Sequence, residues 1–120
     1  MKNKILIIDD EAPIRDLLAQ FLAASGYVVT TAGSAAEALT SVQRDPPDLI
    51  LSDLQLEDAD GLEMIGRLKA VLPTTPVILL TGVLFDAEVV RDILNKQVAS
   101  YVAKTSPLSR IMAEIRHLLA

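Results

Sequence analysis

The sequence contains no cysteine and only one histidine, His117. The absence of cysteine excludes disulfide bonds, thiolate metal sites and a cysteine nucleophile. His117 lies near the end of the last expected helix, where a solvated imidazole complements the helix dipole, so we interpret it as a surface residue. Long hydrophobic runs are also lacking near the N-terminus: the apolar run Ile5–Ile8 has four residues and is too short for a signal peptide or a membrane span. We therefore expect a cytoplasmic protein with no membrane partner.

Positive charge is scarce as well. The 120 residues include 11 Lys and Arg against 16 Asp and Glu, which gives a net charge of −5. This balance argues against direct binding of nucleic acid, because phosphate contacts need a basic surface. Hydrophobic residues make up 51% and charged residues 22%, as in ordinary globular proteins. No repeat, low-complexity tract or linker divides the chain, so we expect one domain over residues 1–120.

Five short apolar segments have the character of β-strands. The expected strands are Lys4–Ile8, Tyr27–Thr31, Leu49–Ser52, Val77–Leu80 and Ser100–Ala103. The first, third and fourth are almost continuously apolar, as is typical of central parallel strands covered on both faces. The second and fifth are more mixed, which suits the edges of a sheet.

Helical periodicity fills the gaps between these strands. Apolar residues recur every three or four positions over residues 14–22, 35–42, 62–72, 89–94 and 108–119. Ser34 and Glu37 are expected to form a capping box before the second helix. Asp86 is expected to cap the fourth helix. Ser106 is expected to cap the fifth, with Pro107 at its first position.

The alternation of strand and helix, repeated five times, predicts an α/β fold. Such a pattern gives a parallel sheet with helices on both faces, joined by right-handed crossovers. Five units cannot close an eight-unit barrel. We therefore expect an open, doubly wound sheet of strand order 2-1-3-4-5, a flavodoxin-like architecture. Its ligand site should lie outside the carboxyl ends of the strands, between the first and third.

Acidic residues follow those two strands. Asp9 and Asp10 come directly after the first strand, and Asp53 follows the third. Because the carboxyl ends of parallel strands meet at one edge of the sheet, three carboxylates should gather there. Negative charges a few ångströms apart repel one another, so the cluster requires a cation. It suits a hard divalent metal with oxygen ligands, and it can present one carboxylate as a nucleophile.

Polar residues also end the two remaining strands on that side: Thr81 follows the fourth and Lys104 follows the fifth. The set of an acidic pair, a lone aspartate, a hydroxyl and an amine, in this order, resembles the chemotaxis-regulator-like receiver domain of two-component response regulators. The segments that carry the resemblance are Ile5–Glu11, Asp48–Leu54, Asp60-Gly61, Leu80–Gly82 and Tyr101–Lys104. Together they extend over the whole chain.

The resemblance implies that Asp53 accepts a phosphoryl group from a sensor histidine kinase or a phosphotransfer protein. It also implies Mg²⁺ as the cofactor, bound directly by Asp10 and mainly through water by Asp9. Asp53 and the backbone carbonyl of Gln55 would complete the protein ligands, and few are needed because Mg²⁺ retains waters. Lys104 would pair with Asp53 and then with a phosphoryl oxygen.

A signalling switch is the function that the resemblance implies. The hydroxyl of Thr81 would be drawn to the phosphoryl group, and Tyr101 would move inward into the vacated space. The surface of the fourth helix, fifth strand and fifth helix would then change and act on an output domain, a target protein or a second copy of the chain. The same site would slowly hydrolyse its aspartyl phosphate, so the protein would be an autocatalytic phosphoacceptor and not a conventional turnover enzyme.

Four positions depart from the family's pattern. Glu57 and Thr105 stand where proline is frequent, Gly82 where alanine is usual, and Val98 where glycine is common. A cis peptide before a residue other than proline costs about 2.5–4 kcal/mol, which favours a trans Lys104–Thr105 bond and leaves the placement of Lys104 open. Because no acidic residue is lost, these departures bear on switching more than on phosphorylation.

Two other functions stay open at this point. The departures at Glu57 and Thr105 fit a receiver-like interaction module that binds partners without being phosphorylated. A flavodoxin-like domain that binds a small molecule is disfavoured, because a flavin needs a phosphate-cradling loop after the first strand. Here that loop is the acidic segment Asp9–Glu11, which repels phosphate when no metal is bound.

Overall fold

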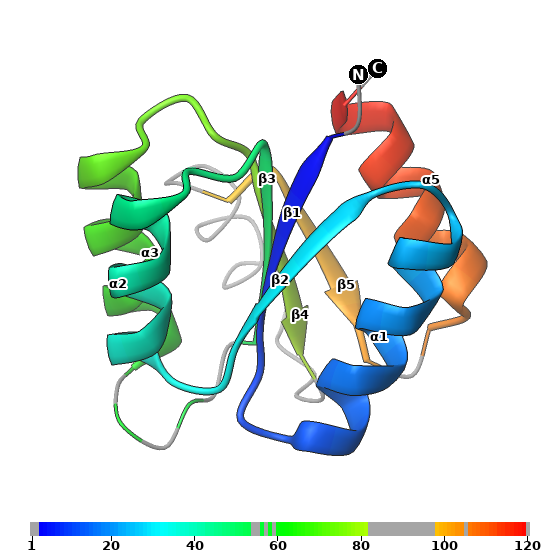
Figure 1. Cartoon of the computed structure of the whole chain (residues 1–120), viewed down its shortest axis with the longest axis horizontal. Helices are drawn as coiled ribbons and strands as arrows, with labels where there is room; N and C mark the ends of the chain where they lie inside the picture. The colour runs from blue at the N-terminus through cyan, green and yellow to red at the C-terminus, as the bar shows by residue number, and fades with distance from the viewer. Residues whose placement is uncertain are drawn as a thin grey trace.

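The structure is a computed structural model that describes residues 3–53, 56, 58, 60–81, 98–104 and 106–119. Its centre is a five-stranded parallel sheet of order β2-β1-β3-β4-β5 (Figure 1). The strands are β1 (Lys4–Ile8), β2 (Val28–Ala32), β3 (Leu49–Asp53), β4 (Val77–Thr81) and β5 (Ser100–Ala103). The predicted α/β class, doubly wound topology and strand order are confirmed.

Helices cover both faces of this sheet. The described helices are α1 (Ala12–Ala24), α2 (Ala35–Arg44), α3 (Gly61–Val71) and α5 (Leu108–Leu119). In Figure 1, α2 and α3 lie on one side of the sheet, and α1 and α5 lie on the other. The helix expected over residues 89–94, its expected cap Asp86, and Gly82 lie outside the described residues. Within the described part of the chain, no helix is long and apolar enough to cross a membrane.

The core has two halves, one on each face of the sheet. Ile5 and Ile7 of β1 pack toward α1 and α5, whereas Leu6 and Ile8 pack toward α2 and α3. Successive side chains of a strand point to opposite faces, so a strand covered on both faces must be apolar at every position. The continuous apolar runs of the sequence are explained by this packing. Val98, where the family often has glycine, is buried in the half formed with α2 and α3.

Four strand boundaries differ by one residue from the prediction: both ends of β2, which runs to Ala32, and the carboxyl ends of β3 and β4. β2 begins at Val28, because the N–H of Tyr27 donates to the carbonyl of Leu22 and so belongs to the turn that ends α1. β3 and β4 each extend one residue further and include Asp53 and Thr81, which pair in the ladder with Leu80 and Ala103 respectively. The two polar residues are thus part of the sheet, which fixes their backbones.

The expected capping box at α2 forms only in part. The Ser34 hydroxyl accepts the Glu37 N–H at 3.1 Å, as predicted. The Glu37 carboxylate, however, accepts the N–H of Gly33 at 3.0 Å, and not that of Ser34. The predicted start of the last helix is wrong by one residue. α5 begins at Leu108 and not at Pro107, and the Pro107 carbonyl accepts the Arg110 N–H in a tight first turn.

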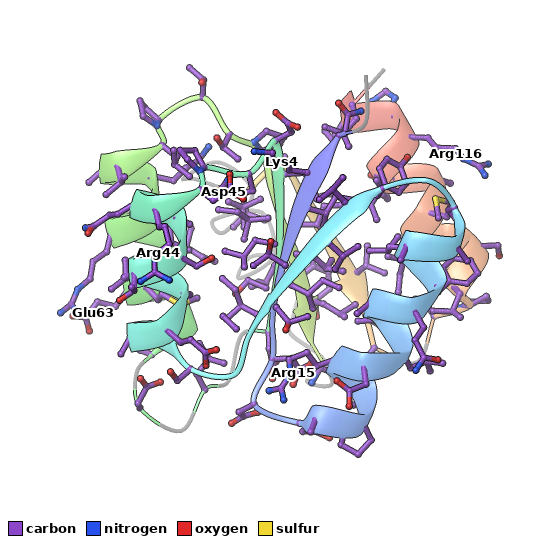
Figure 2. All side chains as sticks on the ribbon, in the orientation of Figure 1. Lys4, Arg15, Arg44, Asp45, Glu63 and Arg116 are labelled. Atoms are coloured by element: carbon purple, nitrogen blue, oxygen red, sulfur yellow. The ribbon has the colours of Figure 1, made fainter. Side chains whose placement is uncertain are left out.

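Charged residues lie at both ends of the sheet. At the amino end of β1, the Lys4 ammonium pairs with Asp45 at 2.6 Å, and its backbone N–H donates to Asp48. Both partners of the Lys4–Asp45 pair are about half exposed, so the pair adds little stability. Figure 2 shows this pair at one end of the molecule and Arg15 at the other. The acidic residues predicted to be functional lie at the end near Arg15.

Candidate functional site

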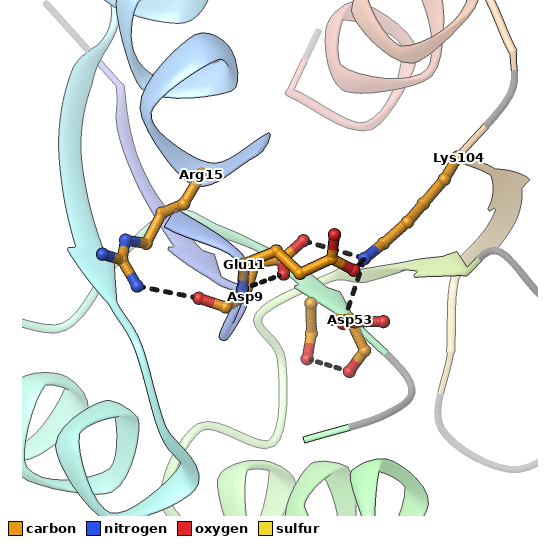
Figure 3. Close-up of polar contacts among 6 residues, drawn as sticks. Asp9, Glu11, Arg15, Asp53 and Lys104 are labelled. Carbon is orange, nitrogen blue, oxygen red and sulfur yellow. Dashed lines mark hydrogen bonds and ion pairs between the residues drawn. The ribbon is translucent and has the colours of Figure 1, made fainter. Parts of the chain in front are cut away.

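Three strands deliver charged residues to one edge of the sheet. Asp9 follows β1, Asp53 ends β3 and Lys104 follows β5 (Figure 3). The backbone of Asp9 continues the ladder, because its N–H donates to the Ala32 carbonyl at 3.1 Å. Asp9 and Asp53 are only 1% and 4% exposed, so both carboxylates are held in a largely water-excluded position. Buried carboxylates require compensation by a cation or by hydrogen bonds.

Lys104 supplies part of that compensation. Its ammonium lies 3.1 Å from Asp53 Oδ2, 3.1 Å from Asp9 Oδ2 and 3.3 Å from Glu11 Oε1 (Figure 3). The bonds to Asp53 and Glu11 have hydrogen-bond geometry. One positive charge therefore faces three carboxylates, and the site keeps a net negative charge.

The ionisation of the site follows from this imbalance. Burial lowers the pKa of the Lys104 ammonium, but the Asp53 and Asp9 carboxylates outweigh burial and hold that pKa above its usual value of 10.5. Burial raises the pKa of the Asp9 carboxyl above its usual value of 3.8, and the Glu11 N–H and Lys104 offset only part of this effect. Lys104 is thus firmly charged, whereas Asp9 is held in an unfavourable charged form.

Asp9 retains an unsatisfied acceptor. Its Oδ1 accepts the Glu11 N–H at 2.9 Å. Its Oδ2 is buried and, among the described residues, forms no hydrogen bond, although the Lys104 ammonium lies 3.1 Å away as an ion-pair partner. Oxygens of Asp9, Asp10, Glu11 and Asp53 all lie within 4.8 Å of one another. Clustered carboxylate oxygens with an unsatisfied acceptor are a suitable donor set for a hard divalent cation such as Mg²⁺.

The structure brings together four of the predicted site residues. Asp9, Asp10 and Asp53 form one cluster, and Lys104 contacts two of its members. Tyr101 lies in β5, half-buried against the part of the core formed with α2 and α3. The backbone of Thr81 ends β4 at the same edge.

The other predictions for this edge fall outside the described residues. They are the Thr81 side chain, Gln55, Glu57 and the Lys104–Thr105 peptide bond.

Three contacts near the site were not predicted. Glu11 was read only as part of the acidic segment, yet its carboxylate reaches Lys104. Arg15, on the first turn of α1, donates from Nη1 to the backbone carbonyl of Asp9 at 3.0 Å (Figure 3). Asp58 accepts the N–H groups of Ala35 and Ala36 at 2.9 and 3.2 Å. The only sequence signal for Glu11 was its place after Asp10, and for Arg15 its helical position facing that loop.

The contact of Asp58 with α2 leads to a prediction about its ionisation. The two backbone N–H groups hold the pKa of the exposed Asp58 carboxyl below its usual value of 3.8. The Asp58 carboxylate therefore stabilises the fold fully above pH 3.8, the pKa of an unperturbed Asp. This stabilisation is lost as the pH falls through the lower pKa that Asp58 has in the folded state. A titration of the carboxyl carbon followed by NMR should give a midpoint below 3.8. A midpoint at or above that value would contradict the contact.

Known proteins match this chain over nearly its whole length. The family model for the response regulator receiver domain matches residues 5–116. A probable transcriptional regulatory protein, TcrX of Mycobacterium tuberculosis, is 30% identical over 96% of this chain and 49% of its own length. The response regulator protein VraR of Staphylococcus epidermidis is 36% identical over 97% of this chain and 56% of its own. The chain thus spans about half the length of these curated relatives.

Solved structures agree with the sequence relatives. A CheY-like response regulator receiver domain protein from Methanospirillum hungatei superimposes with a TM-score of 0.90 at 28% identity, covering 98% of this chain and 93% of the other. A two-component response regulator from Clostridium difficile gives a TM-score of 0.91 at 26% identity, covering 98% and 96%. The family model matches nearly the whole chain, and the strand order is the one predicted from the sequence. The chain belongs to the response regulator receiver domain family.

Proposed function

We propose that this chain is a phosphorylation-dependent signalling switch in which Asp53 accepts a phosphoryl group from a sensor histidine kinase or a phosphotransfer protein. The observation that carries the proposal is the position of the Lys104 ammonium, 3.1 Å from the Asp53 carboxylate inside a cluster of further acids. A buried carboxylate can attack an electrophile, and a cation fixed beside it can stabilise the anion that results.

The chain's own residues supply most parts of the transfer. An oxygen of Asp53 attacks phosphorus, the phosphorus–nitrogen bond of the donor phosphohistidine breaks, and the imidazole leaves with the bonding electron pair. Lys104 remains close enough to Asp53 to pair with a phosphoryl oxygen once the acyl phosphate has formed. Thr81 is the last residue of β4, and we propose that its hydroxyl donates to a second phosphoryl oxygen. Attack by water on phosphorus later breaks the bond to Asp53, releases phosphate and restores the carboxylate. We propose that this dephosphorylation is slow and uses the same site.

Mg²⁺ is the proposed cofactor at the acidic cluster. Asp10 and Asp53 would bind it directly, Asp9 mainly through water, and the backbone carbonyl of Gln55 would be a further ligand. When bound, it neutralises charge on the acceptor and on the transferring phosphoryl oxygens. The unsatisfied Oδ2 of buried Asp9 and the spacing of the cluster's oxygens support this assignment.

The response of the protein is proposed to involve Thr81, Tyr101 and the surface formed by the fourth helical segment, β5 and α5. The two curated relatives are named as a transcriptional regulatory protein and a response regulator, and each is about twice as long as this chain. We therefore propose that residues 1–120 form one cytoplasmic receiver domain whose surface controls an output domain, a target protein or a second copy of the chain.

Phosphorylation can be tested directly with a small phosphodonor. When the protein is mixed with Mg²⁺ and acetyl phosphate, its intact mass should increase by one phosphoryl group. Removal of Mg²⁺ with EDTA should prevent the increase, because four clustered carboxylates then repel an anionic donor. If the mass does not change while a known receiver domain is modified in the same mixture, the chain is an interaction module that is not phosphorylated.

A further inference from the structure

The first turn of α2 is capped by a residue from a distant loop. The Asp58 carboxylate accepts the N–H groups of Ala35 and Ala36, which are 23 and 22 residues earlier in the chain. The remaining N–H of this turn, that of Glu37, goes to the local cap Ser34. The first N–H groups of a helix have no partner within the helix, and they carry its positive dipole end. Asp58 therefore attaches its own loop to α2 by two charge-assisted hydrogen bonds.

That loop also begins at the proposed phosphoacceptor. It starts after Asp53, at the end of β3, and leads to α3. Two described residues hold it on the α2 side: Leu56 packs against the core formed with α2 and α3, and Asp58 caps α2. The chain that leaves Asp53 is thus held at two described points, Leu56 and Asp58.

The same turn of α2 also lies close to the other loop of the site. The Arg15 guanidinium, which donates to the Asp9 carbonyl, lies so close to Gly33 that a Cβ atom there would be 2.6 Å from Nη1. The N–H of Gly33 in turn donates to Glu37 in the first turn of α2. The start of α2 is therefore in contact with the acidic loop through Arg15 and with the phosphoacceptor loop through Asp58.

We propose that Asp58 is a positioning residue that couples metal binding at the acidic cluster to the first turn of α2. This inference rests on the proposed function, because it concerns the same Mg²⁺ site. A ligand binds metal well only when it is already oriented, and the groups that orient it commonly decide metal affinity. Leu56 and Asp58 hold the chain that leaves Asp53, a member of the acidic cluster. Coupling of this kind is reciprocal, so metal binding must also strengthen the contact between Asp58 and α2.

The chain offers a matched pair of variants to test this role. Asp58→Ala removes two caps of α2 and releases the loop, whereas Ser34→Ala removes a cap of the same helix end and leaves the loop attached. In Mg²⁺ titrations followed by amide NMR, Asp58→Ala should weaken binding by about tenfold. Ser34→Ala should leave the affinity at the wild-type value. Asp58→Asn keeps one acceptor oxygen and should fall between wild type and Asp58→Ala.

Hydrogen exchange provides a readout that does not depend on phosphorylation. In the wild type, Mg²⁺ should slow exchange of the Ala35 and Ala36 amides, and in Asp58→Ala it should have no such effect. Wild-type affinity in Asp58→Ala, or an equal loss in Ser34→Ala, would overturn the positioning role and leave the proposed function intact. Failure of the wild type itself to bind Mg²⁺ or to be phosphorylated would overturn the proposed function, and this inference with it.

Discussion

Asp53→Asn is expected to abolish the Mg²⁺-dependent gain of a phosphoryl group from acetyl phosphate. Asparagine has nearly the same shape, so it fits the buried position at the end of β3, which is only 4% exposed. Its amide oxygen carries no full negative charge and is a poor nucleophile towards phosphorus. The rate of mass gain should fall by more than about a thousandfold, as removal of a nucleophile does in enzymes.

A control for this substitution is available at the other end of the sheet. Asp45→Asn makes the same chemical change in an exposed residue that pairs with Lys4, far from the acidic cluster in the topology. This variant should be phosphorylated at the wild-type rate. If Asp53→Asn were still phosphorylated, the acceptor would be another acid of the cluster, and mapping of the modified peptide would identify it. That result would refute the assignment of Asp53.

The sequence was sufficient to predict the sheet because the packing of the sheet constrains every residue of its central strands. β1 and β3 are buried on both faces, so their polar residues lie at the strand ends, apart from Ser52, whose buried hydroxyl donates to the Asp53 carbonyl. Asp9 and Asp53 stand at those positions. Since parallel strands present their carboxyl ends together, the meeting of the two carboxylates follows from topology alone. The same reasoning placed Lys104 at this edge, after β5.

The contacts that the sequence did not predict depend on side-chain length and loop path, which periodicity does not report. Lys104 reaches Glu11 as well as the two buried aspartates because its long stem spans the gap from β5 to the loop after β1. Asp58 caps a helix that is more than twenty residues away in sequence. Local capping rules predicted Ser34 correctly, but they consider only neighbouring residues and so do not identify a cap supplied by another loop.

Lys104→Met is expected to destabilise the metal-free protein strongly. Methionine keeps most of the apolar stem and removes the charge. The side chains of Lys104, Asp9 and Asp53 are 13%, 2% and 5% exposed, so the variant would leave two buried carboxylates without their cation. Removing one partner of a buried ion pair costs about 3 kcal/mol or more in the free energy of unfolding. Urea denaturation in EDTA at neutral pH measures this loss, and equal stability of the variant and the wild type would refute the ion-pair model.

Asp9→Asn is the matched variant, and its effect should have the opposite sign. The pKa of Asp9 is raised in the folded state, so its charged form opposes folding above the unfolded value of 3.8, and a neutral amide removes that cost. The variant should therefore be more stable than the wild type in EDTA at neutral pH. Its advantage should begin to decline as the pH falls through the raised pKa of Asp9, and it should vanish below 3.8, where the wild-type carboxyl is neutral in both the folded and the unfolded state.

Addition of Mg²⁺ should then change the free energy of unfolding by different amounts in the wild type, Lys104→Met and Asp9→Asn. A ligand that binds only the folded state stabilises it in proportion to the logarithm of its concentration over the dissociation constant. In the wild type, Lys104 occupies two of the carboxylates that the cation needs. Lys104→Met should therefore gain more stability from Mg²⁺ than the wild type, and Asp9→Asn should gain less. Equal gains in all three would show that the cation binds elsewhere. The ordering expected here follows from one feature, the competition between an ammonium group and a metal ion for the same buried oxygens.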